Sequence, residues 1–205
     1  VEAAALAFVR ASNPLDEVFV VNFADKVRID VPLTSDVRRL ESGLARVDSI
    51  GGTAMRDAIE LAERHLSEHA RHDRRVLVVV TDGNDNASGH TEADIQRLAE
   101  ERGVTIDAIG LLHDEDASKA GQARRELNRL TETSGGVAYY PETVDAIGEV
   151  ALDLARQIRN QYTIAYAQPP HPNDATYHRI KVVAKGSERL DVRTRAGYRL
   201  RQGGG

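Results

Sequence analysis

The chain has 205 residues, of which 41% are apolar and only 4% aromatic, and it has neither cysteine nor tryptophan. This length suits one α/β domain with an aliphatic core and a small appendage, and the composition excludes disulfide and thiolate chemistry. The net charge of −5 divides unevenly, because residues 1–149 carry 17 basic and 28 acidic side chains whereas residues 150–205 carry 10 and 4.

A change of charge sign along the chain indicates two structural units. The basic residues of the second unit are spread out along the sequence, so they do not form the cluster that nucleic-acid binding needs. No apolar run approaches the roughly 20 residues of a membrane-spanning helix. We therefore expect neither nucleic acid nor a membrane span, and the sequence leaves the oligomeric state open.

The first part of the sequence predicts a helix, a hairpin and a second helix. Glu2–Ala11 has the apolar spacing of a helix. Val18–Val21 is a continuous apolar run, typical of a strand buried on both faces of a parallel sheet. The alternating stretch Val27–Val31 follows after a tight turn, which predicts a hairpin with a half-exposed edge strand. Thr34-Ser35-Asp36 caps a helix predicted to reach Val47.

The next part alternates helices and strands, and this alternation sets the expected fold. Arg75–Val80 is the clearest buried strand, and it follows a long helix predicted over Ala54–Ala70. The alternation continues with a helix capped by Thr91 and ending at Arg102, a strand Val104–Leu112, a helix Ala120–Thr133, a strand Val137–Tyr140 and a helix Asp145–Asn160. Residues 1–160 are therefore predicted to form a doubly wound, mostly parallel sheet with helices on both faces.

The pattern changes after residue 160. Three short stretches have the composition of strands, and proline, glycine and asparagine turns join them. They are Tyr162–Ala167, Tyr177–Ala184 and Leu190–Leu200. Residues 161–201 are therefore predicted to form a small antiparallel β-extension, and residues 202–205 a flexible tail.

Two loops carry the candidate chemistry, because ligands of open α/β sheets bind beyond the carboxyl ends of the strands. Thr53, in Gly51-Gly52-Thr53-Ala54, precedes the long helix, where a threonine commonly just caps the helix. Asp82, in Asp82-Gly83-Asn84-Asp85-Asn86, follows the buried strand, where an aspartate can simply accept loop amides. Taken together, a hydroxyl and a carboxylate at one edge of the sheet could bind a hard cation such as Mg²⁺.

The stretches Val18–Phe23, Gly51–Ala54 and Val76–Gly83, in this order, resemble von Willebrand factor type A domains over residues 1–160. The C-terminal strands resemble the β-extension of a bacterial branch of that family. The resemblance implies a Rossmann-like fold with a metal-ion-dependent adhesion site, and so a protein-binding module, not an enzyme. It also implies a location outside the cytoplasm: periplasmic, secreted or at the cell surface.

By the same resemblance, Thr53 and Asp82 match two ligands of a Mg²⁺ site, which Mn²⁺ or Ca²⁺ could also occupy. An acidic side chain of the partner would complete the coordination of the ion. The side chains around that site are expected to form the rim that contacts the partner, and they are Asn84, Asp85, Asn86 and His113.

One feature of the family is missing from this sequence. The family's first strand ends in Asp-x-Ser-x-Ser, which supplies an aspartate and two serines to the metal. Because Glu2–Ala11 matches the family's first helix, we expect that strand to lie before Val1. A chain without it should bind Mg²⁺ weakly or not at all. Its sheet should also lack a central strand, which leaves backbone groups unpaired.

Two alternatives stay open. The first is a doubly wound hydrolase or phosphatase with Asp82 as its essential carboxylate, which would need a second ionisable group nearby. The sequence has no phosphate-binding glycine motif and no nucleophile elbow. The second is a metal-independent scaffold whose site no longer binds an ion.

His65, His69 and His72 have a spacing that can suit zinc, but their charged surroundings favour a solvated helix face.

Overall fold

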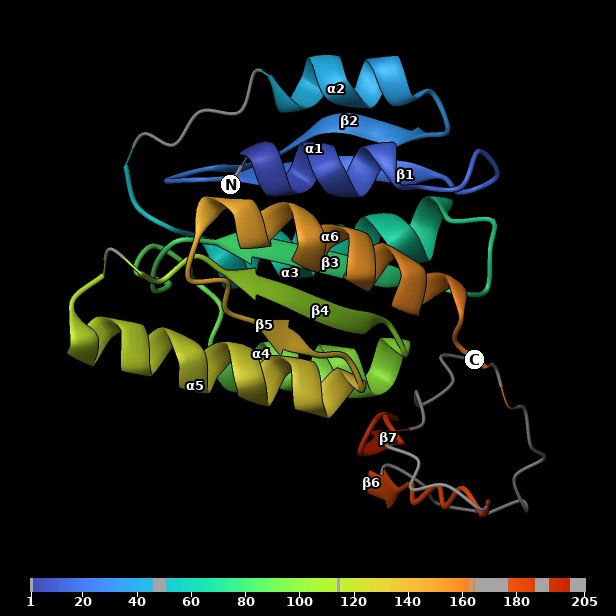
Figure 1. Cartoon of the computed structure of the whole chain (residues 1–205). Helices are drawn as coiled ribbons and strands as arrows, with labels where there is room; N and C mark the ends of the chain where they lie inside the picture. The colour runs from blue at the N-terminus through green and yellow to red at the C-terminus, as the bar shows by residue number, and fades with distance from the viewer. Residues whose placement is uncertain are drawn as a thin grey trace.

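A computed structural model describes residues 2–45, 51–113, 115–162, 164, 177–186 and 192–199, without the side chains of 144 and 145. Figure 1 shows strands layered between helices and a C-terminal hairpin, whose Arg199 side chain forms an ion pair with Glu100 at 2.7 Å. The elements are α1 (Glu2–Arg10), β1 (Val18–Phe23), β2 (Val27–Thr34), α2 (Val37–Leu44), α3 (Met55–His69), β3 (Val76–Thr81), α4 (Glu92–Arg102), β4 (Thr105–Gly110), α5 (Ala117–Ser134), β5 (Ala138–Tyr139), α6 (Val144–Arg159), β6 (Tyr177–Arg179) and β7 (Gly197–Arg199).

The described strands form three hydrogen-bonded groups. β3, β4 and β5 make a parallel sheet in that order, while β1 and β2 form an antiparallel hairpin. β6 and β7 pair antiparallel near the carboxyl end. The predicted α/β class, the parallel sheet and the antiparallel extension are confirmed. The predicted strand at 162–167 lies largely outside the described residues, and the boundaries at residues 160 and 201 stay predictions.

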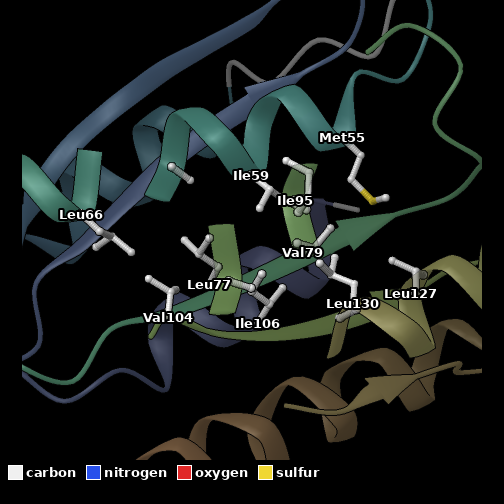
Figure 2. Close-up of a cluster of buried hydrophobic side chains, with 13 residues drawn as sticks. Met55, Ile59, Leu66, Leu77, Val79, Ile95, Val104, Ile106, Leu127 and Leu130 are labelled. Atoms are coloured by element: carbon white, nitrogen blue, oxygen red, sulfur yellow. The ribbon is translucent and has the colours of Figure 1, made fainter. Parts of the chain in front are cut away.

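β3 packs on both faces, as its apolar run predicts, because successive side chains of a strand point to opposite sides; one face is buried and the other is half-buried. Leu77 and Val79 pack with α3, α4 and α5 in the main core, which Figure 2 shows. Val78 and Val80 pack on the other side against α1 and α6. β1 alternates in the same way: Val20 packs with α1 and α2, and its neighbours pack toward the main core.

The hairpin and α5 differ from the sequence prediction in their bounds. β2 continues beyond Val31 to Thr34, which pairs with Val18. Its Pro32 has no N–H to donate and sits on an edge strand, where proline is tolerated. α5 begins at Ala117 rather than at Ala120, because the Asp116 side chain accepts a hydrogen bond from the Ser118 N–H at 2.9 Å and caps the helix there.

The predicted start of α4 is confirmed. Thr91 is its N-cap, and a reciprocal hydrogen bond with Asp94 forms a capping box. α2 begins after the N-cap Asp36, within the predicted cap, and is described to Leu44. In the part of the chain that the structure covers, no helix combines the length and the apolar character needed to cross a bilayer.

Candidate functional site at the carboxyl edge of the sheet

The two predicted metal ligands lie beside one cavity. Thr53 is half-buried just before α3, and Asp82 is exposed directly after β3. Both line a long cavity between β1 and β3, and Asn84, Asn86 and His113 line it as well. The polar end of this cavity is therefore formed by the loops that the sequence singled out.

Hydrogen bonds join these loops across the edge of the sheet. The Thr53 N–H donates to Asn86 Oδ1 at 2.8 Å, and the Asn86 N–H donates to the Thr53 carbonyl at 3.0 Å. On the other side, the Ala54 N–H donates to the Ala24 carbonyl at 3.1 Å. The segment before α3 thus connects the end of β1 with the loop that follows β3.

Thr53 does not cap α3, although a threonine before a helix commonly does so. The N-cap is Ala54, which has no side-chain hydrogen bond. Asn86 therefore engages the backbone of Thr53, and the hydroxyl is not used as a helix cap. This removes the simplest structural explanation for a threonine at this position.

Asp25, in the turn between β1 and β2, is a site residue that the sequence did not reveal. Its carboxylate accepts a hydrogen bond from the Gly52 N–H. Gly51 next to it has a φ of +103°, a left-handed conformation that favours glycine, and a Cβ there would overlap the Asp25 carboxylate. The shape of the loop that carries Thr53 therefore depends on glycine at position 51.

Replacing Gly51 by alanine should destabilise the domain by about 1–3 kcal/mol, because the positive φ is strained for alanine and Asp25 must move. The matched control is Gly148→Ala in α6, where a Cβ meets nothing within 4 Å. That change should raise stability by roughly 0.5–1 kcal/mol. Urea unfolding of both variants measures the difference, and equal effects of the same sign would contradict the assigned geometry.

Asp85 differs from the exposed rim position that the sequence suggested, because its side chain is fully buried. One carboxylate oxygen accepts the Arg56 N–H at 2.7 Å and the Ser88 hydroxyl at 2.6 Å, and the other accepts Arg56 Nη2 at 3.0 Å. Burial by itself raises the pKa of Asp85, but these hydrogen bonds outweigh it and hold the pKa below its usual value. Asp85 therefore fastens its loop to the start of α3.

A second carboxylate fastens the same loop farther along. Asp57 accepts the backbone N–H groups of Gly89 and His90 at 3.0 and 2.9 Å, and it contacts the His90 ring at 2.7 Å. Burial raises the pKa of Asp57, but these contacts together leave the pKa below its ordinary value. Two acidic side chains at the start of α3 and in the loop thus hold the loop after Asp82 in place.

Asn84 contributes an oxygen whose hydrogen-bonding capacity is unused in the described part of the chain. Its side-chain amide donates to the Lys119 carbonyl at 2.9 Å, while its Oδ1 is buried and has no hydrogen-bond partner there. Buried oxygens of this kind are normally satisfied by protein, water or an ion. Asn84 lines the cavity, and its buried amide oxygen has no hydrogen-bond partner among the described residues.

The side-chain oxygens of this site are of the type that binds Mg²⁺, but there are too few of them to fill its coordination sphere. Mg²⁺ takes oxygen ligands in octahedral geometry and commonly keeps several waters. Thr53 and Asp82 offer a hydroxyl and a carboxylate, of which only the carboxylate is charged. In the described ranges, no three histidine or acidic side chains gather as a metal-binding group. These residues alone are expected to bind the ion weakly.

The three histidines of α3 and the segment after it do not converge on a common point. The rings of His65 and His69 stack on each other with centroids 4.5 Å apart. His72 lies 3.9 Å from the Glu17 carboxylate instead. Burial lowers the pKa of His65, which favours its neutral form.

Residues 1–84 match a family described as the von Willebrand factor type A domain. Among curated proteins, none matches the chain. A von Willebrand factor type A protein from Catenulispora acidiphila is similar in structure, with a TM-score of 0.62 and 19% identity. The similarity covers 77% of this chain and 37% of that protein, so the chain spans well under half of that relative.

Two further solved structures share the fold. An aerotolerance-related membrane protein from Bacteroides fragilis has a TM-score of 0.64 at 19% identity, over 78% of this chain and 87% of that one. The pilus adhesin SpaC from Lactobacillus rhamnosus GG has a TM-score of 0.60 at 12% identity, over 77% of this chain and 27% of that one. At these identities the likeness shows the fold alone.

Proposed function

We propose that this chain, which has the von Willebrand factor type A fold, is a module that binds a protein partner at the carboxyl edge of its sheet. The observation that carries the proposal is that Thr53 and Asp82 line one cavity, in loops that hydrogen bonds hold together. Loops that are held in place and carry oxygen atoms at the surface are suited to recognising another protein. The pilus adhesin among the structurally similar proteins supports a role in binding another protein.

A divalent cation is part of the proposal. Mg²⁺, or Mn²⁺ or Ca²⁺ in its place, would be held by Asp82 and Thr53, with water in the remaining positions. An ion with so few protein ligands retains positions for an outside oxygen. An acidic side chain of the partner is the natural group to fill one of them, so the ion would link the two proteins.

The surface around the ion would make the remaining contacts with the partner. Asn86 and His113 are exposed, and Asn84 is half-buried beside the cavity. Asp85 has a supporting role in this proposal, because its buried carboxylate holds the loop. The relatives named as a membrane protein and a pilus adhesin support a location outside the cytoplasm.

Replacing Asp82 by alanine should remove divalent-ion binding with a change in stability of no more than about 0.5 kcal/mol, because the side chain is exposed. Mn²⁺ is the probe, and paramagnetic broadening of the backbone amide signals of Thr53, Asp82 and Asn86 is the measurement. The control is Asp73→Ala, which removes an exposed aspartate at the far end of the cavity and should leave the broadening unchanged.

Binding of the chain to an array of acidic peptides tests the proposed type of partner. Binding that needs Mg²⁺ and is lost in Asp82→Ala supports the proposal. Binding that persists unchanged with a chelator contradicts the role of the metal and favours the metal-independent scaffold. Broadening by Mn²⁺ that survives Asp82→Ala contradicts the assignment of the ligand.

A further inference from the structure

The loops that follow β3 and β4 leave the sheet side by side, because the two strands end in register. Thr81, the last residue of β3, pairs with Gly110, the last residue of β4. The Leu111 N–H then donates to the Thr81 carbonyl at 2.8 Å, one residue beyond that pair. The two loops therefore start from the same place on the carboxyl edge of the sheet.

A second contact joins these loops where α5 begins. The Asn84 side chain donates to the Lys119 carbonyl, in the first turn of α5, at 2.9 Å. Glu115 lies along the chain between the two contacts, in the turn after β4, where its N–H donates to the Leu112 carbonyl at 3.4 Å. The loop that carries Glu115 is therefore held beside the loop that begins at Asp82.

The Glu115 carboxylate lies against Gly83, the residue directly after Asp82. A Cβ at position 83 would lie only 3.3 Å from Glu115 Oε1, so glycine there leaves space for this carboxylate. Glu115 is half-buried, and it lines the cavity together with Asp82 and Thr53. Two carboxylates and one hydroxyl, from three different loops, therefore border the same cavity.

Neither carboxylate is neutralised within the described part of the chain. Among those residues the side chains of Asp82 and Glu115 have no hydrogen bond and no ion pair. Asp116 differs, because its carboxylate caps α5. The described residues that line the cavity include no lysine, and their arginines lie before β3 or at the end of α6; they are Arg71, Arg74, Arg75 and Arg159. Two negative charges without a counter-charge attract a cation.

We propose that Glu115 is a further residue of the cation site, a carboxylate that acts on the ion from the loop after β4. The inference rests on the proposed binding of a divalent ion at Asp82 and Thr53. Mg²⁺ commonly keeps several waters when few protein oxygens bind it, and Glu115 accepts a hydrogen bond from one of them. Outer carboxylates of this kind orient the groups that bind the metal, and their loss typically weakens metal binding about 10–100-fold.

Titration of the full chain with Mn²⁺ tests the role of Glu115, with paramagnetic broadening of the Thr53, Asp82 and Asn86 amide signals as the measurement. Glu115→Gln keeps the size of the side chain and removes its charge, so it should weaken Mn²⁺ binding roughly tenfold. Glu115→Asp keeps the charge and should bind Mn²⁺ more tightly than Glu115→Gln. Both variants should unfold at the same urea concentration as wild type, which separates an effect on the ion from an effect on the fold.

Asp116→Asn is the matched control, because asparagine caps a helix as well as aspartate does. It removes the neighbouring exposed charge, which solvent and salt screen, and should change Mn²⁺ affinity by less than about twofold.

The outcomes separate this inference from the proposed function. If Asp82→Ala abolishes the broadening but Glu115→Gln binds Mn²⁺ like wild type, Glu115 is not part of the site and Asp82 remains a ligand. Equal weakening by Glu115→Gln and Asp116→Asn would mean that overall charge alone matters, which also overturns the role of Glu115. Broadening that is absent from wild type, or that survives Asp82→Ala, refutes the cation site itself and the role of Glu115 with it.

Discussion

Replacing Asp85 by alanine is expected to destabilise the domain by about 3 kcal/mol or more, because it leaves a largely buried arginine without its partner. The Asp85 side chain is fully buried and that of Arg56 is 24% exposed. The carboxylate also accepts the backbone N–H groups of Arg56 and Ser88 at 2.7 and 3.1 Å. Buried donors that lose their acceptor carry a desolvation cost of their own.

Urea unfolding at neutral pH measures this effect, with Asp73→Ala as the control. Asp73 is exposed, so its removal should change stability by no more than about 0.5 kcal/mol. A loss below about 1 kcal/mol for Asp85→Ala would show that Arg56 finds another acceptor, and Glu126, at 3.7 Å, is the nearest candidate. Because Asp85 also orders the loop that begins at Asp82, the variant should weaken Mn²⁺ binding as well.

Replacing Glu63 by glutamine is expected to stabilise the domain at pH 8 and to have little effect near pH 4.5. Glu63 of α3 is fully buried, and neither carboxylate oxygen has a hydrogen-bond partner in the described part of the chain. Burial raises the pKa of Glu63 to about 7, against the opposing effect of Arg102. The folded protein therefore holds a proton there that the unfolded chain has already lost.

The direction of the pH dependence follows from that difference. Below pH 4.5 Glu63 is protonated in both the folded and the unfolded protein, so its burial carries no ionisation cost. Between pH 4.5 and about 7, Glu63 is ionised in the unfolded chain but still protonated in the folded protein. The free energy of unfolding therefore falls over this range and stays low above pH 7. The full penalty is about 3 kcal/mol, at about 1.4 kcal/mol per pKa unit, and glutamine avoids it because it does not ionise.

Unfolding of wild type and Glu63→Gln at pH 5, 6.5 and 8 tests this expectation. Asp107, whose pKa burial raises to about 6, titrates in both proteins and cancels in the comparison. The control is Glu68→Gln on the exposed side of the same helix, which should show no such pH-dependent gain. A variant less stable than wild type at pH 8 would mean that Glu63 is ionised and stabilised by Arg102.

The order and type of the helices and strands could be predicted because apolar spacing and capping residues indicated the same elements. The short apolar run Val76–Val80 favours a buried strand, and Thr91 marks the start of a helix. Thr53 and Asp82 were placed at one edge because parallel strands end on the same side of a sheet. Both residues line the same cavity, and their role as metal ligands stays a prediction.

The polar frame of the site did not follow from the sequence. Asp25 meets Gly52, and Asp85 meets Arg56, across 27 and 29 residues, and no local pattern predicts such pairs. The position of Asp85 inside rather than at the rim follows from those contacts. Glu63 did have a signal, since Ile59, Ala62, Glu63 and Leu66 have the spacing of one buried helix face.

β1 and β3 do not pair in the described residues, so packed side chains join the N-terminal hairpin to the rest of the fold. Polar contacts also join α1 to α6, such as that of the Arg159 guanidinium with the Ala11 carbonyl just after α1. No backbone ladder crosses between the two strands in the described ranges. Phe19, Val21 and Phe23 of β1 pack into the main core, and Ala4 and Phe8 of α1 pack in the second core cluster with α6, so buried side chains connect residues 2–45 with the parallel strands β3, β4 and β5.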